Sequence, residues 1–164
     1  MPICQRIPYR VLVLCAFLLQ TMIPSTAQTP ASPHIRYKLI DVGTFGGPNS
    51  AETVEFPFVN DTGMVVGFAD TPTPDPFSPG AFLSHAFRWQ RGVLTDLGTL
   101  PDGIGSFAVW SNNKGQVVGL SANGLIDPAS GFPEGRGVLW DKTGAISDLG
   151  TLGGDESLAF GIIV

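Results

Sequence analysis

Cysteine is nearly absent from this 164-residue chain, and both examples, Cys4 and Cys15, lie close to the amino terminus. The sequence beyond Cys15 therefore has no disulfide, no thiol nucleophile and no cysteine-ligated metal. Charged residues make up only 14% of the chain, and histidine occurs twice, as His34 and His85. A catalytic or metal site would have to be built from few ionisable side chains, and we predict neither a metal nor a cofactor.

Long apolar runs are also scarce, and the clearest one extends from Val11 to Leu19. Two arginines precede this run, and small residues end the segment at Ala27. This order predicts a signal peptide at residues 1–27, cleaved before Gln28, and hence a secreted or periplasmic protein. The run is shorter than the roughly 20 apolar residues that cross a bilayer, so we expect no stable membrane anchor.

Basic residues are fewer than acidic residues. The chain has nine lysines and arginines against fourteen acidic residues, a net charge of −5. Cleavage after Ala27 removes two arginines and no acidic residue, leaving seven basic and fourteen acidic residues, a net charge of −7. This charge repels phosphate backbones, and no basic run along the sequence provides a local exception. We therefore expect no nucleic-acid partner.

A repeat with a period near 50 residues dominates the remaining sequence. The stretch NDTGMVVG at 60–67 matches NNKGQVVG at 112–119 without a gap, at an offset of 52 positions. A second phrase occurs three times, as DVGTFGG at 41–47, DLGTL at 96–100 and DLGTLGG at 148–154. Apolar stretches between these motifs are short, and 21 glycines and 14 prolines leave little room for helices. The period and composition predict an all-β fold of propeller-like antiparallel blades.

The repeat also predicts the division of the chain. A Pro-rich tail at 28–35 is followed by repeats at about 36–95 and 96–147 and a truncated one at 148–164. We expect two complete four-stranded repeats plus partial ones at each end. The strands of the second complete repeat are expected at 106–111, 116–122, 137–141 and 145–149. Single strands are expected at 36–41 and 158–163.

The residues that define the repeat are expected to be structural. Asn and Gly at the first and fourth positions of a turn suit a type I turn that leads into a strand with both faces buried. These residues are Asn60, Gly63, Asn112 and Gly115. The aspartate of the other phrase is expected to end the last strand of a blade and to accept hydrogen bonds from its own loop, with Thr44, Thr99 or Thr151 as candidate donors. A ring of carboxylates for acid–base chemistry is the alternative for Asp41, Asp96 and Asp148.

Histidine and tryptophan also have structural interpretations. His85 has Arg136 as its counterpart in the second repeat, and a metal needs three or four converging ligands, so we expect a structural or surface role. Trp89 and Trp140 occupy equivalent positions and are expected to pack between blades with their N–H groups hydrogen-bonded. A platform for sugars is the alternative use of these two indoles.

The segment after the second strand of each repeat is the candidate binding surface. It is expected to be a loop at 70–76 and again at 122–128, because repeat proteins often place variable loops on one binding face. A plain spacer is the equal alternative. The residues expected to face a ligand are Asp70, Asp75, Asp127 and Phe132.

Three motifs in fixed order carry a family resemblance: the Asp-Leu-Gly-Thr phrase, Asn-x-x-Gly-x-Val-Val-Gly, and HAFRW at 85–89. In these motifs the chain resembles the extracellular HAF-repeat proteins, from about Tyr37 to its end. The resemblance implies export and a bacterial source, and it implies no particular reaction. The chain departs from the family pattern at 136–138, where Arg-Gly-Val replaces His-Ala-Phe, and at 161–164, where the next Asn-x-x-Gly turn would fall.

Two complete blades and two fragments are too few for a closed ring, which typically has four to eight blades. Open blade edges favour self-association. The leading hypothesis is an exported, non-enzymatic repeat protein that acts as a binding or structural module, with a glycan or a protein as its ligand. One alternative is a carbohydrate-active propeller enzyme or a fragment of one, and another is a truncated, non-functional gene copy.

Overall fold

The computed structural model describes residues 36–51 and 58–163 of the chain. The chain divides into two units, Met1–Leu39 and Ile40–Val164. The described residues of the first unit, 36–39, are exposed and have no regular secondary structure. The predicted signal peptide and Pro-rich tail lie outside the described residues. In the described part of the chain, no helix is long and apolar enough to cross a membrane.

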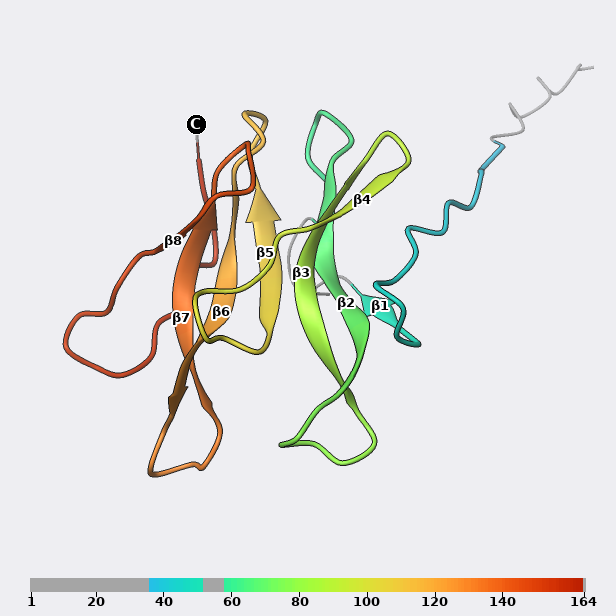
Figure 1. Cartoon of the computed structure of the whole chain (residues 1–164). Coiled ribbons are helices and arrows are strands. Elements are labelled where there is room, and N and C mark those ends of the chain that lie inside the picture. The colour runs from blue at the N-terminus through green and yellow to red at the C-terminus, as the bar shows by residue number, and fades with distance from the viewer. Residues whose placement is uncertain (1–35, 52–57, 164) are drawn as a thin grey trace, which may run out of the picture. The chain divides into compact units, whose positions relative to one another are not determined.

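The second unit contains two four-stranded antiparallel sheets, in each of which strands that follow one another along the chain are neighbours (Figure 1). The first sheet consists of β1 (Ser50–Ala51), β2 (Val65–Pro74), β3 (Phe82–Gln90) and β4 (Val93–Asp96). The second consists of β5 (Ser106–Ser111), β6 (Val117–Ile126), β7 (Pro133–Trp140) and β8 (Ile146–Asp148). The predicted all-β class is confirmed, and neither sheet closes on itself.

The strands of the second sheet begin or end close to the predicted positions. One difference is common to both sheets: β2 continues to Pro74 and β6 to Ile126, through segments that were expected to be loops. In both hairpins the pairing shifts register at the same place in the repeat, between Asp70 and Pro74 and between Ala122 and Ile126. A proline is tolerated in a strand at such an irregularity because its missing N–H is not needed there. The true loops are 75–81 and 127–132.

The single strands predicted at 36–41 and 158–163 are wrong. Both segments lack regular secondary structure where they are described. A strand needs a partner for its backbone hydrogen bonds, and no described residue pairs with either segment as a strand.

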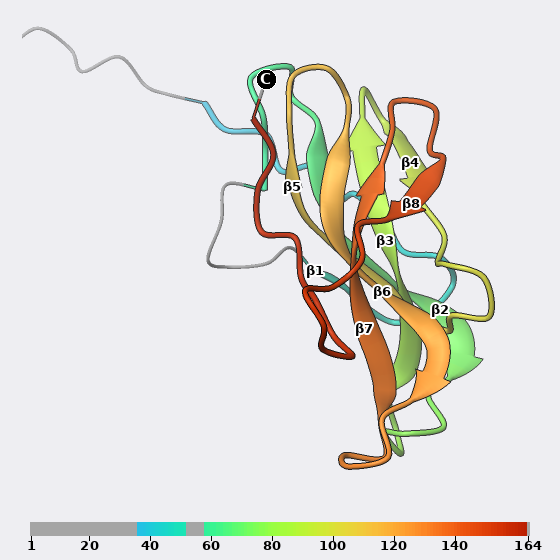
Figure 2. The same cartoon turned by 90° about the vertical axis from the view of Figure 1, so that its left-hand side faces the viewer.

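The segment after Asp148 instead lies across the second sheet. Ser157 N donates to Gly135 O at 3.0 Å, and Ala159 N lies 3.4 Å from Gly119 O. The chain therefore passes from β7 to β6, as its path in Figure 2 shows. Leu158 and Ala159 main-chain atoms lie so close to Gly137 that a Cβ on this glycine would be crowded.

The hydrophobic core lies between the two sheets, where β5 packs against β2 and β3. Phe68 and Phe107 meet edge to face across this interface, with ring centroids 4.9 Å apart. Burial of apolar surface and aromatic contacts of this kind stabilise the stacked pair of sheets. The buried members of the core are Met64, Val66, Ala86, Leu97, Leu100, Ala108, Val117, Val138 and Trp140.

The second strand of each repeat has no solvent-facing side in its first half, as its sequence predicts. Val117 and Val118 are consecutive and both buried, because one sheet face meets the other sheet and the opposite face is covered as well. Gly119 follows them, and a Cβ at this position would collide with the main-chain oxygen of Phe107. Close strand pairing at this point therefore requires glycine.

Candidate functional site

The repeated aspartates act within their own loops. Asp41, Asp96 and Asp148 each accept a hydrogen bond at Oδ1 from the main-chain N–H two residues later, at 2.9, 2.7 and 2.7 Å. β4 and β8 end at Asp96 and Asp148, as predicted. These contacts are those of an Asx turn, a structural use that the same position serves in every repeat.

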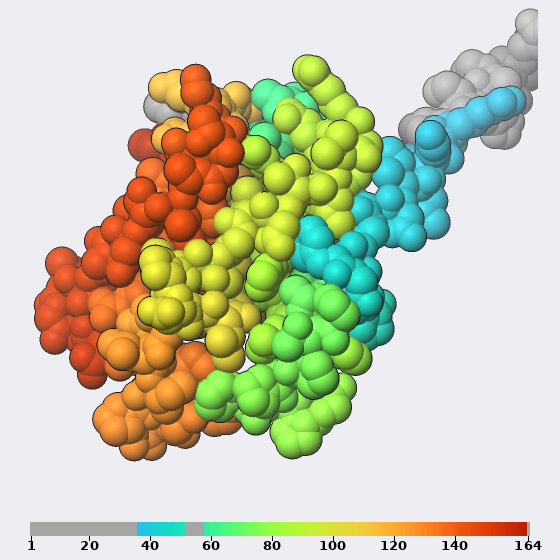
Figure 3. Space-filling view, in the orientation of Figure 1, coloured from blue at the N-terminus to red at the C-terminus, as the bar shows by residue number. Residues whose placement is uncertain are grey.

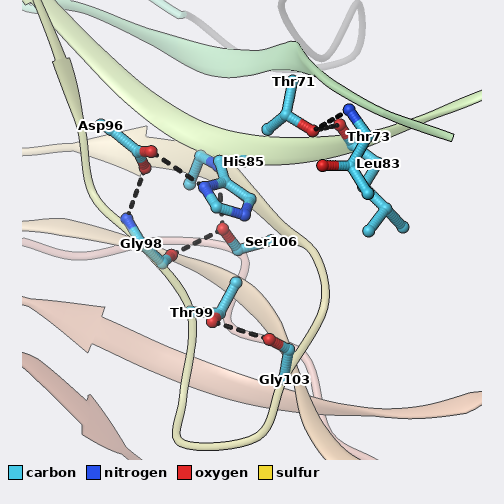
Figure 4. Close-up of polar contacts among 10 residues, drawn as sticks. Thr71, Thr73, Leu83, His85, Asp96, Gly98, Thr99, Gly103 and Ser106 are labelled. Atoms are coloured by element: carbon cyan, nitrogen blue, oxygen red, sulfur yellow. Dashed lines mark hydrogen bonds and ion pairs between the residues drawn. The ribbon is translucent and has the colours of Figure 1, made fainter. Parts of the chain in front are cut away.

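The threonines of this phrase bond the backbone of their loops and not the aspartates, for which they were the candidate donors. Thr44 Oγ1 donates to Gly47 O at 2.8 Å, and Thr99 Oγ1 donates to Gly103 O at 2.9 Å (Figure 4). The Thr44 contact closes the loop before β1, and the Thr99 contact closes the connection between the two sheets. Neither hydroxyl donates to the aspartate. The expectation of a threonine donor is therefore wrong for both repeats.

One carboxylate in this set has a side-chain partner. Asp96 Oδ2 lies 2.9 Å from His85 Nδ1, and the two side chains face each other in Figure 4. An ionised carboxylate only accepts, so Nδ1 carries the proton. Burial acts to raise the pKa of Asp96, but the hydrogen bonds from His85 and Gly98 and the charge of the imidazole outweigh it and hold this pKa below its usual value. No group of three or more potential metal ligands occurs among the described residues.

The second repeat does not reproduce this pair. Arg136 stands in the place of His85, and its Nη2 atom lies 3.8 Å from Glu134 Oε2. Glu134 is buried and also accepts a hydrogen bond from Asn123 Nδ2 at 3.0 Å. A contact found in only one of two repeats is a local feature of that repeat.

The Asn-x-x-Gly turns form as predicted. Gly63 N donates to Asn60 O and Gly115 N to Asn112 O, at 2.9 and 3.1 Å, and both glycines have positive φ angles. Each asparagine side chain accepts from the backbone two and four residues later. In addition, Asn60 Nδ2 donates to Asn112 O at 2.9 Å, which ties the turns of the two repeats together.

The two equivalent tryptophans differ in burial. Trp140 is completely buried in the core, whereas Trp89 is only half-buried. The prediction of core packing therefore holds fully for Trp140 alone. Its Nε1 atom is buried without a hydrogen-bond partner among the described residues, contrary to the expectation of a bonded N–H group.

Asp70 does not project from a loop as expected. It lies within β2 and is buried, and its carboxylate accepts hydrogen bonds from Asn49 N, Asn49 Nδ2 and Ser84 Oγ at 3.2, 3.0 and 2.8 Å. Its main chain also bonds Phe45, Gly47 and Asn49. Asp70 thus holds the segment before β1 against the first sheet.

The other three candidate ligand-facing residues lie at the tips of the two long hairpins. Asp75 and Asp127 each stabilise their tip, accepting hydrogen bonds from Phe77 N and from Ala129 N at 2.8 and 2.9 Å. Phe132 is 53% exposed, and its ring centroid lies 6.2 Å from that of Phe77 in the other hairpin. The tips thus approach each other, as the space-filling view in Figure 3 shows at the lower edge.

A cleft of about 270 Å³ lies between these hairpins. Its apolar walls include four phenylalanines, two from each repeat: Phe77, Phe82, Phe107 and Phe132. Asp75 and Glu134 supply carboxylates to the lining, and no lysine, arginine or histidine contributes to it. Concave, mainly apolar sites with a few placed polar groups are the usual form of ligand pockets, so this cleft is the candidate functional site.

Comparison of the chain with protein-family models, curated protein sequences and solved structures finds no match.

The sequence predicted two residues of the cleft lining, Asp75 and Phe132, but not Phe77 and Glu134. Phe77 lies two residues after the candidate Asp75 and could have been found. No sequence pattern marks Glu134 as a lining residue, because its burial depends on how the two hairpins pack.

Proposed function

We propose that this protein is an exported, non-enzymatic binding module made of propeller-like blades, and that the cleft between the hairpins is its ligand site. The observation that carries the proposal is the cleft itself. Equivalent hairpins of two repeats extend beyond the shared core and enclose aromatic rings from both. Exposed apolar surface of this kind, rimmed by polar groups, is typical of binding sites.

The lining favours a neutral ligand with an apolar face and hydroxyl groups, such as an oligosaccharide. Aromatic faces can pack against the C–H surface of a sugar ring. The carboxylates of Asp75 and Glu134 accept hydrogen bonds from hydroxyls and repel anions. Glu134 is held by Asn123, so it is oriented before a ligand arrives.

A non-enzymatic role is supported by the contacts of the repeated aspartates, whose carboxylates each serve their own loop. The stacking of one open sheet on the next supports propeller-like blades.

Export and the HAF-repeat relationship rest on the sequence motifs. Export is tested first, by measuring the mass of the extracellular product. A mass that corresponds to 28–164 is expected, and a product retaining residues 1–27 would contradict cleavage.

Self-association is the second part of the proposal. Apolar side chains are exposed on the segment that follows β8, among them Leu149 at 56% and Leu152 at full exposure. Association through this surface would remove them from water. Sedimentation velocity at increasing protein concentration should show oligomers, and a monomer at all concentrations would contradict this part.

Titration of residues 28–164 with neutral oligosaccharides by isothermal calorimetry tests the ligand site. Phe132→Ala and Phe77→Ala should each weaken binding by about tenfold or more, since removal of a central aromatic anchor typically costs at least 1–2 kcal/mol. Val93→Ala is the control, because Val93 is 63% exposed and does not line the cleft.

Binding that is equal in all three variants would show that the cleft is not the site. Binding of the neutral apolar dye Nile red without any oligosaccharide binding would favour an apolar protein segment as the ligand. Release of reducing sugar during the titration would instead support the enzyme alternative.

A further inference from the structure

A second concavity, of about 400 Å³, has a chemical character opposite to that of the cleft. It is formed by turns at the other end of the strands, which Figure 1 shows at the top. Four basic residues line it: Arg88, Arg91, Lys114 and Lys142. Between Ile40 and Val164 the chain has only five basic residues and all fourteen acidic ones, so this concavity gathers nearly every cation of the unit.

The repeat builds this site from equivalent positions. Arg91 and Lys142 both come two residues after the tryptophan of the third strand, at an offset of 51 positions. Thr62 and Lys114 are equivalent in the Asn-x-x-Gly turns, at an offset of 52 positions. Packing of the two sheets brings these turns together, so that cations spread over more than 50 positions of sequence line one concavity.

Arg88 fixes the relative position of two of the lining segments. Its Nη1 atom donates to Lys142 O at 2.9 Å, which connects β3 of the first sheet to the turn after β7 of the second. The side chains of Arg91, Lys114 and Lys142 are free of hydrogen bonds and ion pairs with described residues. Their positive charges are therefore available to a ligand.

Among the described residues, no nearby carboxylate forms an ion pair with the cations that line the concavity. Asp141 Oδ1 accepts from Thr143 N, Thr143 Oγ1 and Ala145 N within its own turn. Asp61 Oδ2 accepts from Asn113 Nδ2 at 2.8 Å. Neither aspartate is among the lining residues, and no other acidic residue is.

We propose that this concavity binds an anionic glycan, one that carries carboxylate or sulfate ester groups. Its volume lies within the range of roughly 300–1,000 Å³ that small organic ligands occupy, which is more space than a single inorganic anion fills. Gln90, Asn113 and Thr62 place amide and hydroxyl groups among the cations, and these groups can bond sugar hydroxyls.

A nucleic acid fits this lining less well. The described lining residues include no aromatic ring on which a base could stack. The proposal is also independent of the cleft between the hairpins. That cleft favours neutral ligands, and its variants leave these four cations intact.

Isothermal calorimetry on residues 28–164 tests the proposal with an oligogalacturonate and a sulfated heparin-derived hexasaccharide as probes. At least one probe should bind at low ionic strength, and its affinity should fall as salt is added. The double variant Lys114→Gln/Lys142→Gln should weaken binding by about tenfold or more. Lys38→Gln, which removes one positive charge from an exposed residue outside the lining, should leave it unchanged.

Thermal unfolding should confirm that the double variant is folded, as expected for exposed lysines. The proposal is overturned if neither probe binds, or if the double variant and Lys38→Gln bind alike. It is also overturned if a neutral oligosaccharide of equal length, single-stranded DNA or inorganic sulfate binds this concavity as tightly as the charged sugars do. Phe132→Ala should leave this binding unchanged, so that failure here is distinct from failure at the cleft.

Discussion

Ser106 Oγ lies 2.8 Å from Ala86 N and 2.7 Å from Gly98 O, so a single hydroxyl of the second sheet bonds two backbone groups of the first sheet and its following loop (Figure 4). The contact recurs one repeat later, where Ser157 Oγ accepts from Gly137 N at 2.9 Å. A serine at this position therefore joins each sheet to the chain segment that follows it.

Ser106→Ala should destabilise the protein by about 1–3 kcal/mol, because it leaves a buried N–H and a carbonyl without their partner. Ser157→Ala should cost less, since its contact is only partly buried and lies in a segment without a strand partner. Urea unfolding at equilibrium gives both values. Equal losses of unfolding free energy in the two variants would show that the Ser106 contact between the sheets stabilises the protein no more than the Ser157 contact does.

The two tryptophans provide a second comparison between repeats. Trp140→Ala should lower the free energy of unfolding by about 3–5 kcal/mol, the usual cost of emptying a buried aromatic site. Trp89→Ala should cost clearly less, because Trp89 is half-buried. Urea unfolding of the paired variants measures the difference. A larger loss of unfolding free energy for Trp89→Ala would contradict the assignment of the main core to the space between the two sheets.

The pair formed by His85 and Asp96 predicts a pH dependence. Since the pKa of Asp96 is lowered in the folded protein, its ionised form contributes stability above its unfolded pKa. This contribution is lost as the pH falls through the folded pKa. Asp96→Asn should therefore reduce stability at neutral pH, and its difference from the unmodified protein should shrink below about pH 4. The effect should be about 0–1 kcal/mol, because both side chains are partly exposed and screened by solvent.

Asp148→Asn is the matched control for this pair. Asp148 makes the same contact with its own loop, at Gly150 N, but the residue in the place of His85 is Arg136, which lies beside Glu134. The difference between the two variants isolates the imidazole contact. Chemical denaturation between pH 2 and pH 7 measures it, and identical curves for both variants would assign the whole effect to the loop.

Local patterns predicted the parts of this fold that depend on neighbouring residues. The Asn-x-x-Gly turns, the aspartates that end β4 and β8, and the buried second strands all follow from short motifs. The long hairpins were missed because 70–76 and 122–128 were expected to be loops, whereas β2 and β6 continue into them through an irregular register. The end strands failed because pairing requires a neighbour that short motifs do not reveal.

The cationic concavity was missed for a related reason. Arg88 and Lys142 are 54 positions apart, and only the stacking of the sheets brings them together. The charge along the sequence shows scattered bases in an acidic chain. A comparison of aligned repeats could have found one sign of the site, because Arg91 and Lys142 occupy equivalent turn positions.

Arg91 provides a test that separates stability from binding. It occupies the first position of the two-residue turn between β3 and β4 with a φ angle of 52°, in the left-handed region that side chains other than Asn, Asp and Gly seldom adopt. Arg91→Asn should therefore stabilise the fold by up to about 1 kcal/mol, since the left-handed region costs other side chains roughly that much. The same change should weaken binding of charged oligosaccharides, because it removes a cation from the concavity.

Asp102→Gly is the control for this change, because Asp102 also has a positive φ angle, 61°, and does not line the concavity. It should change the unfolding temperature little, because aspartate already tolerates the left-handed region, and it should leave the binding of charged sugars unchanged. Thermal unfolding and calorimetry on both variants measure the two effects separately. If Arg91→Asn stabilises the protein and binds charged sugars as tightly as before, Arg91 has no role in the site. If it instead destabilises the protein, the arginine side chain stabilises the turn through contacts that outweigh its backbone strain.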